Sequence, residues 1–361
     1  MQKRCVAING RFLAVPATGV QRVAEELIKH LDILLSDGRS AASSWTLFLP
    51  RNATRRLNLK NIAVRKSDNL TGHRWEQFEL PKLATGQLLV NLCNQAPLSS
   101  RGGIVMIHDA QTFVSPRSYS WLFRQWYHFS TPRIGARAAR VLTVSKYSRD
   151  RLIEYGVAPA GKIEVVYNGI DHLASLAADA RSLSKFGLTH GSYVVSLSNT
   201  QKHKNLAVLF DAFERLTATR LKLALVGAAG RAEFERKGIS PPGNVVLCGK
   251  VSDAELRALY ENAICLAFPS TTEGFGLPPL EAMLVGCPAV VAPCGALPEV
   301  CGEAAVYVAP DNPAEWANAI NHLWHDVDAR VSLIDKGRRR AADFTWQKSA
   351  KQLLNIINDS L

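Results

Sequence analysis

The sequence predicts an α/β protein with two doubly wound domains that face each other across a cleft. Two blocks of the chain each alternate short apolar strands with amphipathic helices, the pattern of parallel sheets covered by helices. An Ala/Ser-rich segment after Asp171 separates the blocks. At 361 residues and 47% apolar side chains, the chain is long enough for two cores.

These observations set the expected domain boundaries. We place an N-terminal domain at residues 1–178 and a C-terminal domain at 179–343. Residues 344–361 form a last amphipathic helix, starting at Trp346, that can cross back to the N-terminal domain.

The first block contains short apolar runs suited to a parallel sheet. Strands are expected at 5–8, 46–49, 62–64, 88–92, 104–107, 141–144 and 163–167. A turn-forming loop after the first strand leads to Gly19, which opens a helix. A glycine loop before a helix suits a phosphate, but on local grounds an ordinary strand-to-helix turn is the favoured interpretation.

The strand at 104–107 ends in His108-Asp109. Ligands of open α/β sheets bind beyond the carboxyl ends of strands, so His108 is a candidate site residue. The alternative is a hydrogen-bonded residue at the rim of the sheet.

Residues 117–140 mix aromatic side chains with five arginines and no acid. On a helix beginning near Tyr119, Leu122, Trp126 and Phe129 share one face. This pattern fits a membrane-surface helix, and it fits equally a core-facing helix with a solvated basic face.

The second block continues the alternation and contains three features suited to an anion. Strands are expected at 193–197, 223–226, 245–247, 264–268 and 288–292, and helices at 206–216, 253–262 and 278–285. The anion-suited features are Lys204 at a helix start, the Gly-Ala-Ala-Gly loop after the second strand, and the Gly-Phe-Gly segment before the third helix. Alone, Lys204 reads as a surface lysine.

Two glutamates flank the Gly-Phe-Gly segment, with seven residues between them. Glu273 precedes the helix and can lie beside a bound anion. Glu281 lies inside the helix among apolar neighbours and is expected to be partly buried, where ribose hydroxyls would satisfy its carboxylate.

Composition excludes several classes of protein. No apolar run is long enough to span a membrane, and the N-terminus lacks the apolar stretch of a signal peptide. Seven cysteines without CxxC pairs indicate a reducing compartment, and we assign no metal. We therefore expect a cytoplasmic protein.

The net charge of +12 is concentrated in the first half of the chain. Residues 1–170 contain 24 Lys and Arg against 11 Asp and Glu, whereas residues 171–361 contain 19 against 20. The N-terminal half is therefore expected to face something anionic, such as nucleic acid, an anionic membrane or a phosphorylated acceptor.

The stretch EGFGLPPLEAMLVGCPAVV, with PEVCGEAA after it, resembles the donor-site signature of retaining GT-B glycosyltransferases. The same family is matched by four further segments: HKNLAVLFDAF, LTVSKYSRDRLIEYGV, KIEVVYNGID and HDA. The resemblance runs from about residue 104 to 310, and TGVQRVAEEL near the start matches more weakly. The resemblance implies the GT-B fold and a metal-independent, nucleotide-sugar-dependent transferase without cofactor. The bacterial relatives include mannosyltransferases of surface-polysaccharide assembly.

The resemblance also implies roles for individual residues. Glu281 would hold the ribose hydroxyls. Glu273 and His108 would lie near the donor sugar as the catalytic residues. The other donor-binding residues would be Gly19, Ser198, Lys204, Val251, Gly274, Phe275, Gly276 and Leu277. Many relatives have an arginine where this chain has Ser198. Either Lys202 or His203 supplies that charge, or the diphosphate is held with one cation fewer.

The function expected is transfer of a hexose, with mannose from GDP-mannose as the specific hypothesis, to a lipid-linked saccharide of lipopolysaccharide or exopolysaccharide synthesis. The basic half predicts peripheral attachment to the inner face of the cytoplasmic membrane. Two alternatives stay open: a non-catalytic scaffold subunit with the same fold, and a nucleic-acid-binding protein. The charge alone supports the latter, so no nucleic-acid partner is assigned.

Overall fold

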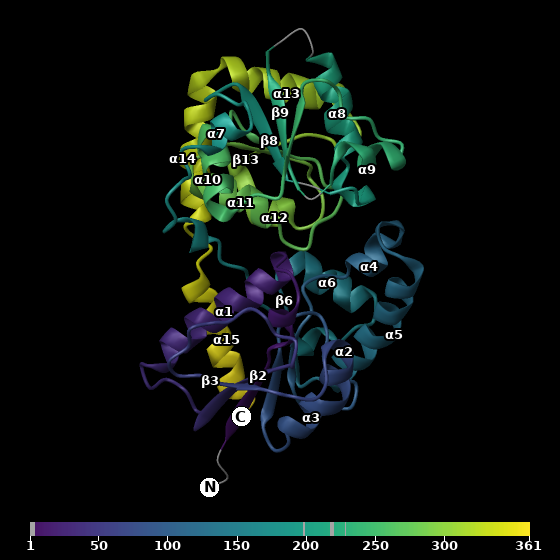
Figure 1. Ribbon diagram of the computed structural model, residues 1–361, viewed down its shortest axis with the longest axis vertical. Coiled ribbons are helices and arrows are strands. Elements are labelled where there is room, and N and C mark those ends of the chain that lie inside the picture. Colours follow the sequence, from purple (N-terminus) through teal and green to yellow (C-terminus); the bar gives the residue numbers. More distant parts are fainter. Residues whose placement is uncertain (1–3, 198, 217–219, 228) are drawn as a thin grey trace. The chain divides into compact units, whose positions relative to one another are not determined.

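The computed structural model describes residues 4–197, 199–216, 220–227 and 229–361. The chain divides into two compact units, each described here by itself (Figure 1). Unit 1 comprises the chain up to Pro116, Ser120–Gly169 and Thr345–Leu361, and unit 2 comprises Arg117–Tyr119 and Ile170–Phe344. Each unit is built on one parallel sheet, so the predicted pair of doubly wound α/β domains is confirmed.

Unit 1 contains a seven-stranded parallel sheet in the order β3-β2-β1-β4-β5-β6-β7. Its strands are β1 (Cys5–Asn9), β2 (Ser44–Leu49), β3 (Ala63–Lys66), β4 (Leu88–Asn91), β5 (Ile104–Met106), β6 (Arg140–Thr143) and β7 (Ile163–Val165). The central strands are apolar because helices cover both of their faces, whereas the four residues of the edge strand β3 are exposed.

The helices of unit 1 are α1 (Gly19–Leu35), α2 (Gly72–Arg74), α3 (Leu80–Leu83), α4 (Gln111–Val114), α5 (Trp121–Arg137), α6 (Lys146–Glu154) and α15 (Trp346–Asp359). A π-helical turn, Trp75–Glu79, joins α2 to α3. Turns of this kind are rare in proteins overall, but many of those known lie at functional sites.

The last helix of the chain is part of unit 1, where α15 packs beside α1 (Figure 1). The Ser349 hydroxyl donates to the Tyr167 carbonyl at 2.5 Å, and Gln352 donates to the Val165 carbonyl at 2.7 Å. At Gly169 a Cβ atom would lie 2.2 Å from the backbone nitrogen of Trp346, so any side chain there would push the two segments apart.

Unit 2 contains a six-stranded parallel sheet in the order β10-β9-β8-β11-β12-β13. Its strands are β8 (Tyr193–Leu197), β9 (Lys222–Val226), β10 (Val245–Gly249), β11 (Leu266–Phe268), β12 (Ala289–Val291) and β13 (Ala305–Tyr307). Its helices are α7 (Ser182–Lys185), α8 (Leu206–Arg215), α9 (Arg231–Arg236), α10 (Asp253–Asn262), α11 (Leu277–Leu284), α12 (Leu297–Cys301), α13 (Pro313–His325) and α14 (Val327–Ala341).

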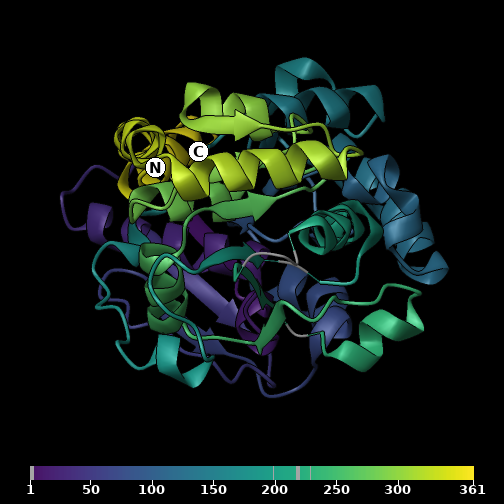
Figure 2. The ribbon, with the colours of Figure 1, turned by 90° about the horizontal axis from the view of Figure 1, so that it is seen from above.

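The core of unit 2 gathers side chains from the sheet and from two of these helices. Leu209 and Phe213 of α8 and Trp316 and Ile320 of α13 are buried in one apolar cluster. Figure 2 shows α13 lying across the top of the unit, with α8 seen end-on beside it. None of the helices in the described residues has the length and hydropathy that a bilayer-spanning segment needs.

Candidate active site

The segment between β11 and α11 is held in a conformation that depends on glycine. The cap residue before α11, Gly276, has a left-handed φ of +108°, and a Cβ atom there would lie 2.6 Å from the Cδ2 atom of Leu297. The helix then starts Leu277-Pro278-Pro279. Because proline has no N–H, Leu277 is the only one of these three residues that can offer a backbone amide to an anion.

Lys204 and Glu273, which lie 69 positions apart in the sequence, meet in unit 2. The Lys204 Nζ atom lies 2.7 Å from Glu273 Oε1, and both side chains are largely buried. The Glu273 carbonyl accepts a hydrogen bond from the Ala296 N–H at 2.9 Å. At Gly295, φ is +64° and a Cβ atom would lie 2.4 Å from the Glu273 nitrogen, so the loop after β12 fixes the backbone of Glu273.

The loop before α8 is tied to the same segment. Asn205 adopts a left-handed conformation, and its side-chain amide donates to the Pro310 carbonyl at 2.6 Å and to the Pro269 carbonyl at 3.3 Å. The Thr271 N–H donates to the His203 carbonyl at 2.8 Å. Asn205 thus positions Lys204. Sequence analysis did not single it out, although asparagine is one of the few residues that tolerate this conformation.

His203 cannot supply the charge expected at Ser198, which itself lies outside the described residues. Its side chain is buried, with Nδ1 2.9 Å from the Ser118 hydroxyl. Burial, aided by the Lys204 charge, lowers the pKa of His203 to about 4, so the ring is neutral near pH 7. Lys202 is exposed and lines a pocket of about 310 Å³ that also includes Arg117 and Lys237. Of these two residues, Lys202 is therefore the candidate for the missing positive charge.

Glu281 lies inside α11 and is 6% exposed. Its carboxylate lies close to His172, whose Nε2 is 3.4 Å from Oε1. Both side chains of this pair are more than nine-tenths buried. Sequence analysis missed His172, because a contact across 109 positions leaves no local pattern.

The other donor-side candidates occupy the carboxyl ends of strands or the start of α11. Val251 follows β10, which ends at Gly249 in a left-handed conformation, and it is half-buried just before the Ser252 cap of α10. Gly274 is buried in the loop before α11. Phe275 is also buried, with its ring edge-on to Phe344 at 5.7 Å between centroids. The side chain of Phe275 is therefore packed inside unit 2.

In unit 1, His108 is 4% exposed at the end of β5. Its Nε2 lies 2.9 Å from the Leu92 carbonyl, and its backbone N–H donates to the Asn94 side-chain oxygen at 2.8 Å. Burial lowers the pKa of His108 to about 4. The ring is therefore neutral near pH 7, and because a carbonyl only accepts, Nε2 carries the proton and Nδ1 is left as an acceptor.

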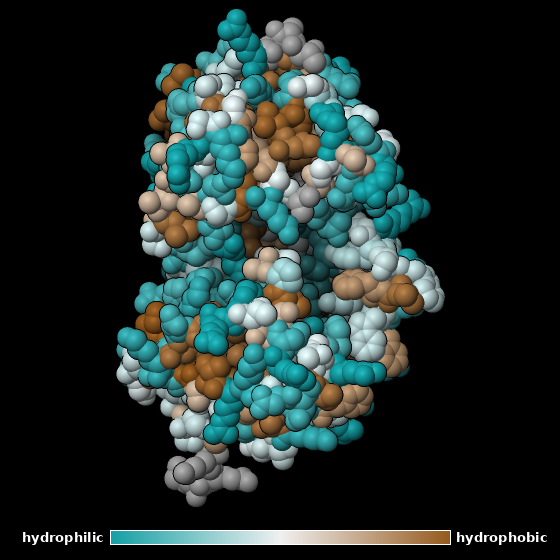
Figure 3. Space-filling view, in the orientation of Figure 1, coloured by the Kyte–Doolittle hydropathy of each residue, from teal (hydrophilic) through white to brown (hydrophobic). Residues whose placement is uncertain are grey.

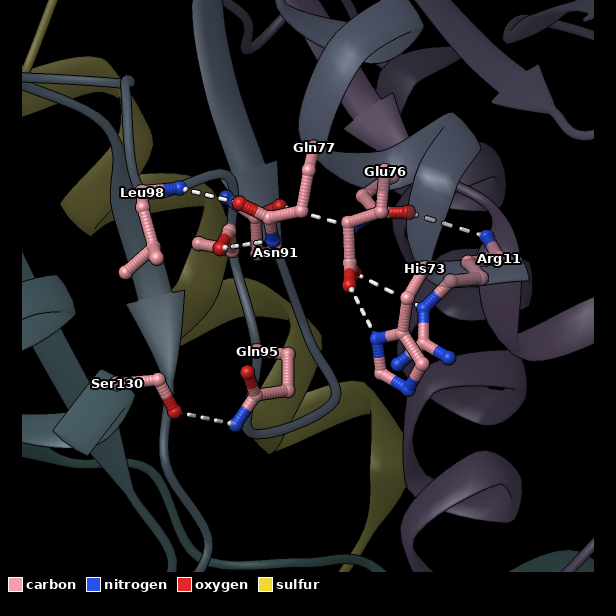
Figure 4. Close-up of polar contacts among 10 residues, drawn as sticks. Arg11, His73, Glu76, Gln77, Asn91, Gln95, Leu98 and Ser130 are labelled. Carbon is pink, nitrogen blue, oxygen red and sulfur yellow. Dashed lines mark hydrogen bonds and ion pairs between the residues drawn. The ribbon is translucent and has the colours of Figure 1, made fainter. Parts of the chain in front are cut away.

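A buried polar cluster lies at the carboxyl ends of β1 and β4 (Figure 4). Glu76 Oε1 accepts from the Asn9 amide at 2.8 Å and lies 3.0 Å from Arg11 Nε, while Oε2 lies 3.4 Å from His73 Nδ1. Asn9 also donates to Asn91 at 3.0 Å. Burial opposes ionisation, but hydrogen bonds from His73 and Asn9 and the Arg11 charge outweigh it, so the pKa of Glu76 is lowered.

Gly19 opens α1 and is exposed, and its neighbour Thr18 donates its N–H to the Gln21 side chain at 3.2 Å. The start of α1 is thus capped by Thr18 and Gln21. A helix start of this kind can also face an anion. Among the described residues, no group of three or more His, Cys, Asp or Glu side chains is arranged to hold a metal ion.

Comparison with known proteins finds glycosyltransferases over both units. Residues 94–172 match the family model described as Glycosyltransferase Family 4, and residues 191–326 match that of Glycosyl transferases group 1. The chain is 26% identical over 256 residues to the O-antigen chain mannosyltransferase RfbU of Salmonella typhimurium, covering 69% of this chain and 68% of RfbU.

A second relative is the MMP alpha-(1->4)-mannosyltransferase of Mycolicibacterium hassiacum, 32% identical over 251 residues, which cover 66% of this chain and 59% of the relative. Among solved structures, the Anabaena protein Alr3699/HepE in complex with UDP-glucose superposes with a TM-score of 0.68 at 19% identity, covering 99% of this chain and 100% of that one. The fold is thus GT-B, and the family matches support a glycosyl-transfer activity.

Proposed function

We propose that this chain, which has the GT-B fold and glycosyltransferase relatives, is a retaining, metal-independent enzyme that moves a hexose from a nucleotide sugar to a saccharide acceptor. The observation that carries the proposal is the buried carboxylate of Glu281, which lies 3.4 Å from the Nε2 atom of His172. A buried carboxylate loses the hydration that stabilises its charge, so it needs hydrogen-bond donors. The hydroxyls of a ribose would supply them.

The diphosphate of the donor is assigned to Lys204 and to the start of α11. Lys204 is paired with Glu273, and a diphosphate would compete with that carboxylate for the same ammonium group. With two prolines in its first turn, α11 offers few amides, so the Leu277 N–H and Lys204 together would stabilise the charge that develops on the leaving group. Lys202 is the candidate for a second cation.

In the proposed reaction, the acceptor hydroxyl forms a bond to the anomeric carbon as the bond to the diphosphate breaks on the same face of the sugar. The hydroxyl proton passes to the departing diphosphate oxygen, so no protein base is required. Glu273 would contact the donor sugar, and His108 would accept a hydrogen bond from a sugar hydroxyl through Nδ1. The protein's part is to hold the acceptor hydroxyl and the departing diphosphate on the same face of the sugar and to offer fixed donors.

Mannose from GDP-mannose is our specific donor hypothesis, supported by the two relatives that are named mannosyltransferases. The name of RfbU, an O-antigen chain enzyme, supports a lipid-linked or growing oligosaccharide as the acceptor. Incubating the purified protein with a saccharide acceptor and GDP-, UDP- or dTDP-sugars and measuring nucleotide release tests the donor class. Release from GDP-mannose alone is expected, and release from none of them would contradict the proposed function.

A membrane-bound acceptor motivates the further proposal that the enzyme works at an anionic membrane surface, on the inner face of the cytoplasmic membrane. Helix α5 buries Ser130, Thr131, Ile134 and Gly135, whereas Leu122 is 73% exposed and Phe129 46% exposed. Two of the three side chains on this aromatic face are therefore exposed, whereas Trp126 is half-buried. The Arg133 guanidinium lies 3.8 Å from the centre of the Phe129 ring.

Figure 3 shows hydrophobic side chains at the surface over α4 and α5. Exposed aromatic side chains beside arginines are suited to the headgroup region of an anionic bilayer. Flotation with phosphatidylglycerol and phosphatidylcholine vesicles tests the proposal. Wild type should float with the anionic vesicles, and L122S/F129S should float less.

The matched control is V327S/V331S, which removes two exposed valines of α14 in unit 2. Equal flotation of wild type and L122S/F129S, or no preference for anionic lipid, would contradict membrane docking through α5.

A further inference from the structure

His172 is held in a short turn that belongs to unit 2. The 3-10 turn Asp171–Leu173 follows Ile170, whose N–H donates to the Phe344 carbonyl at 3.2 Å. The guanidinium of Arg257, on α10, donates to the carbonyls of Leu173 and Ala174, each at 3.0 Å. Contacts on both sides of His172 therefore fix its backbone.

The side chain of His172 reaches α11, and its Nε2 lies 3.4 Å from Glu281 Oε1. The two side chains are 7% and 8% exposed, so water screens the contact little. The terminal torsion of a glutamate side chain has a broad distribution of angles, so a carboxylate without a fixed partner can rotate. A donor at Oε1 would restrict that rotation and leave Oε2 to accept from a ligand.

We propose that His172 is a positioning residue for nucleotide binding, which turns the Glu281 carboxylate toward the ribose hydroxyls. The inference deepens the proposed function, because it rests on Glu281 being the ribose-binding carboxylate. With its proton on Nε2, His172 donates toward Oε1, and the hydroxyls of the ribose donate to the oxygen that stays open.

Two substitutions that differ by one methylene separate this role from mere filling of space. In H172Q the side-chain amide nitrogen reaches about as far as Nε2 of histidine, whereas in H172N it falls short. Both are polar, so neither leaves an apolar group facing Glu281. E281Q, which keeps the size of the side chain and removes its charge, serves as the reference for complete loss of the ribose contact.

The experiment measures the dissociation constants of GDP and 2′,3′-dideoxy-GDP, and of the corresponding uridine pair, for the four proteins by calorimetry. Circular dichroism verifies that each variant is folded. For wild type, the ribose form of the nucleotide that binds should be favoured by at least about tenfold, the factor expected for hydrogen bonds to a charged group.

The ribose preference should persist in H172Q, fall to a few-fold in H172N and vanish in E281Q. Should H172N keep the full preference while E281Q loses it, the positioning role of His172 is overturned and the proposed function stands. A wild-type protein that binds nucleotide without preferring ribose overturns the inference as well. Binding of neither nucleotide contradicts the proposed function itself.

Discussion

Acid should destabilise the protein through its buried histidines, and His108 gives a quantitative case. Its pKa falls from an ordinary value of 6.5 to about 4 in the folded chain, because burial disfavours the charged ring. A histidine with a lowered folded pKa favours the folded state when neutral and opposes it when protonated. Stability is therefore complete above pH 6.5 and is lost as the pH falls from there toward 4.

The size of the loss follows from the difference between the two pKa values. Linkage with unfolded and folded pKa values of 6.5 and 4 gives a loss of about 2 kcal/mol between pH 7 and pH 5, approaching about 3 kcal/mol below pH 4. The substitution H108Q removes the titrating group and keeps a donor for the Leu92 carbonyl, which His108 Nε2 approaches to 2.9 Å.

Urea unfolding of wild type and H108Q at pH 7 and pH 5, followed by circular dichroism, measures the difference. The variant should lose about 2 kcal/mol less stability than wild type over this interval, since other titrating groups, including His203, are common to both proteins. Equal losses in the two proteins would refute the assignment of His108 as a buried, neutral histidine.

Two further substitutions test how the sites are built. G295A should destabilise the protein by clearly more than G191A. Both positions have a left-handed φ, whose strain in alanine is about 1 kcal/mol, but only at Gly295 (φ +64°) would the added Cβ atom clash, 2.4 Å from the Glu273 nitrogen, whereas no atom lies within 4 Å of it at Gly191. Equal shifts in melting temperature for the two variants would rule out the clash. E76Q should destabilise the protein by about 3 kcal/mol because it leaves Arg11 without its buried partner, and adding R11M should recover part of the loss; a stability equal to wild type in urea unfolding would contradict an ionised Glu76.

The architecture was predictable from the sequence because parallel strands buried on both faces read as apolar runs. The runs at β1, β5 and β8 are of this kind, and their burial leaves almost no polar residue inside them. The short strand β13 was missed, although it lies within the apolar run of residues 304–309. The π-helical turn before α3 was missed as well, since no local sequence rule identifies it.

Some residues of the candidate site were likewise predictable from the sequence, and others were not. Lys204 lies just before a helix, Glu273 lies in a glycine-containing loop, and Glu281 lies inside the helix that follows this loop. The spacing of these residues in the sequence was enough to predict them as site residues. The partner of Glu281, His172, was not predictable, because the contact depends on how a turn of the chain packs against α11. The choice between a buried and an exposed aromatic face on α5 likewise depended on tertiary packing, since the helix offers apolar side chains on more than one side.

The central claim is that Glu281 binds the ribose of a nucleotide-sugar donor, and donor turnover by E281Q tests it most directly. With the nucleotide sugar that wild type turns over, E281Q should lose at least about tenfold in kcat/KM, as expected for hydrogen bonds to a charged group, with an unchanged circular dichroism spectrum. Turnover by E281Q within twofold of wild type would contradict the account.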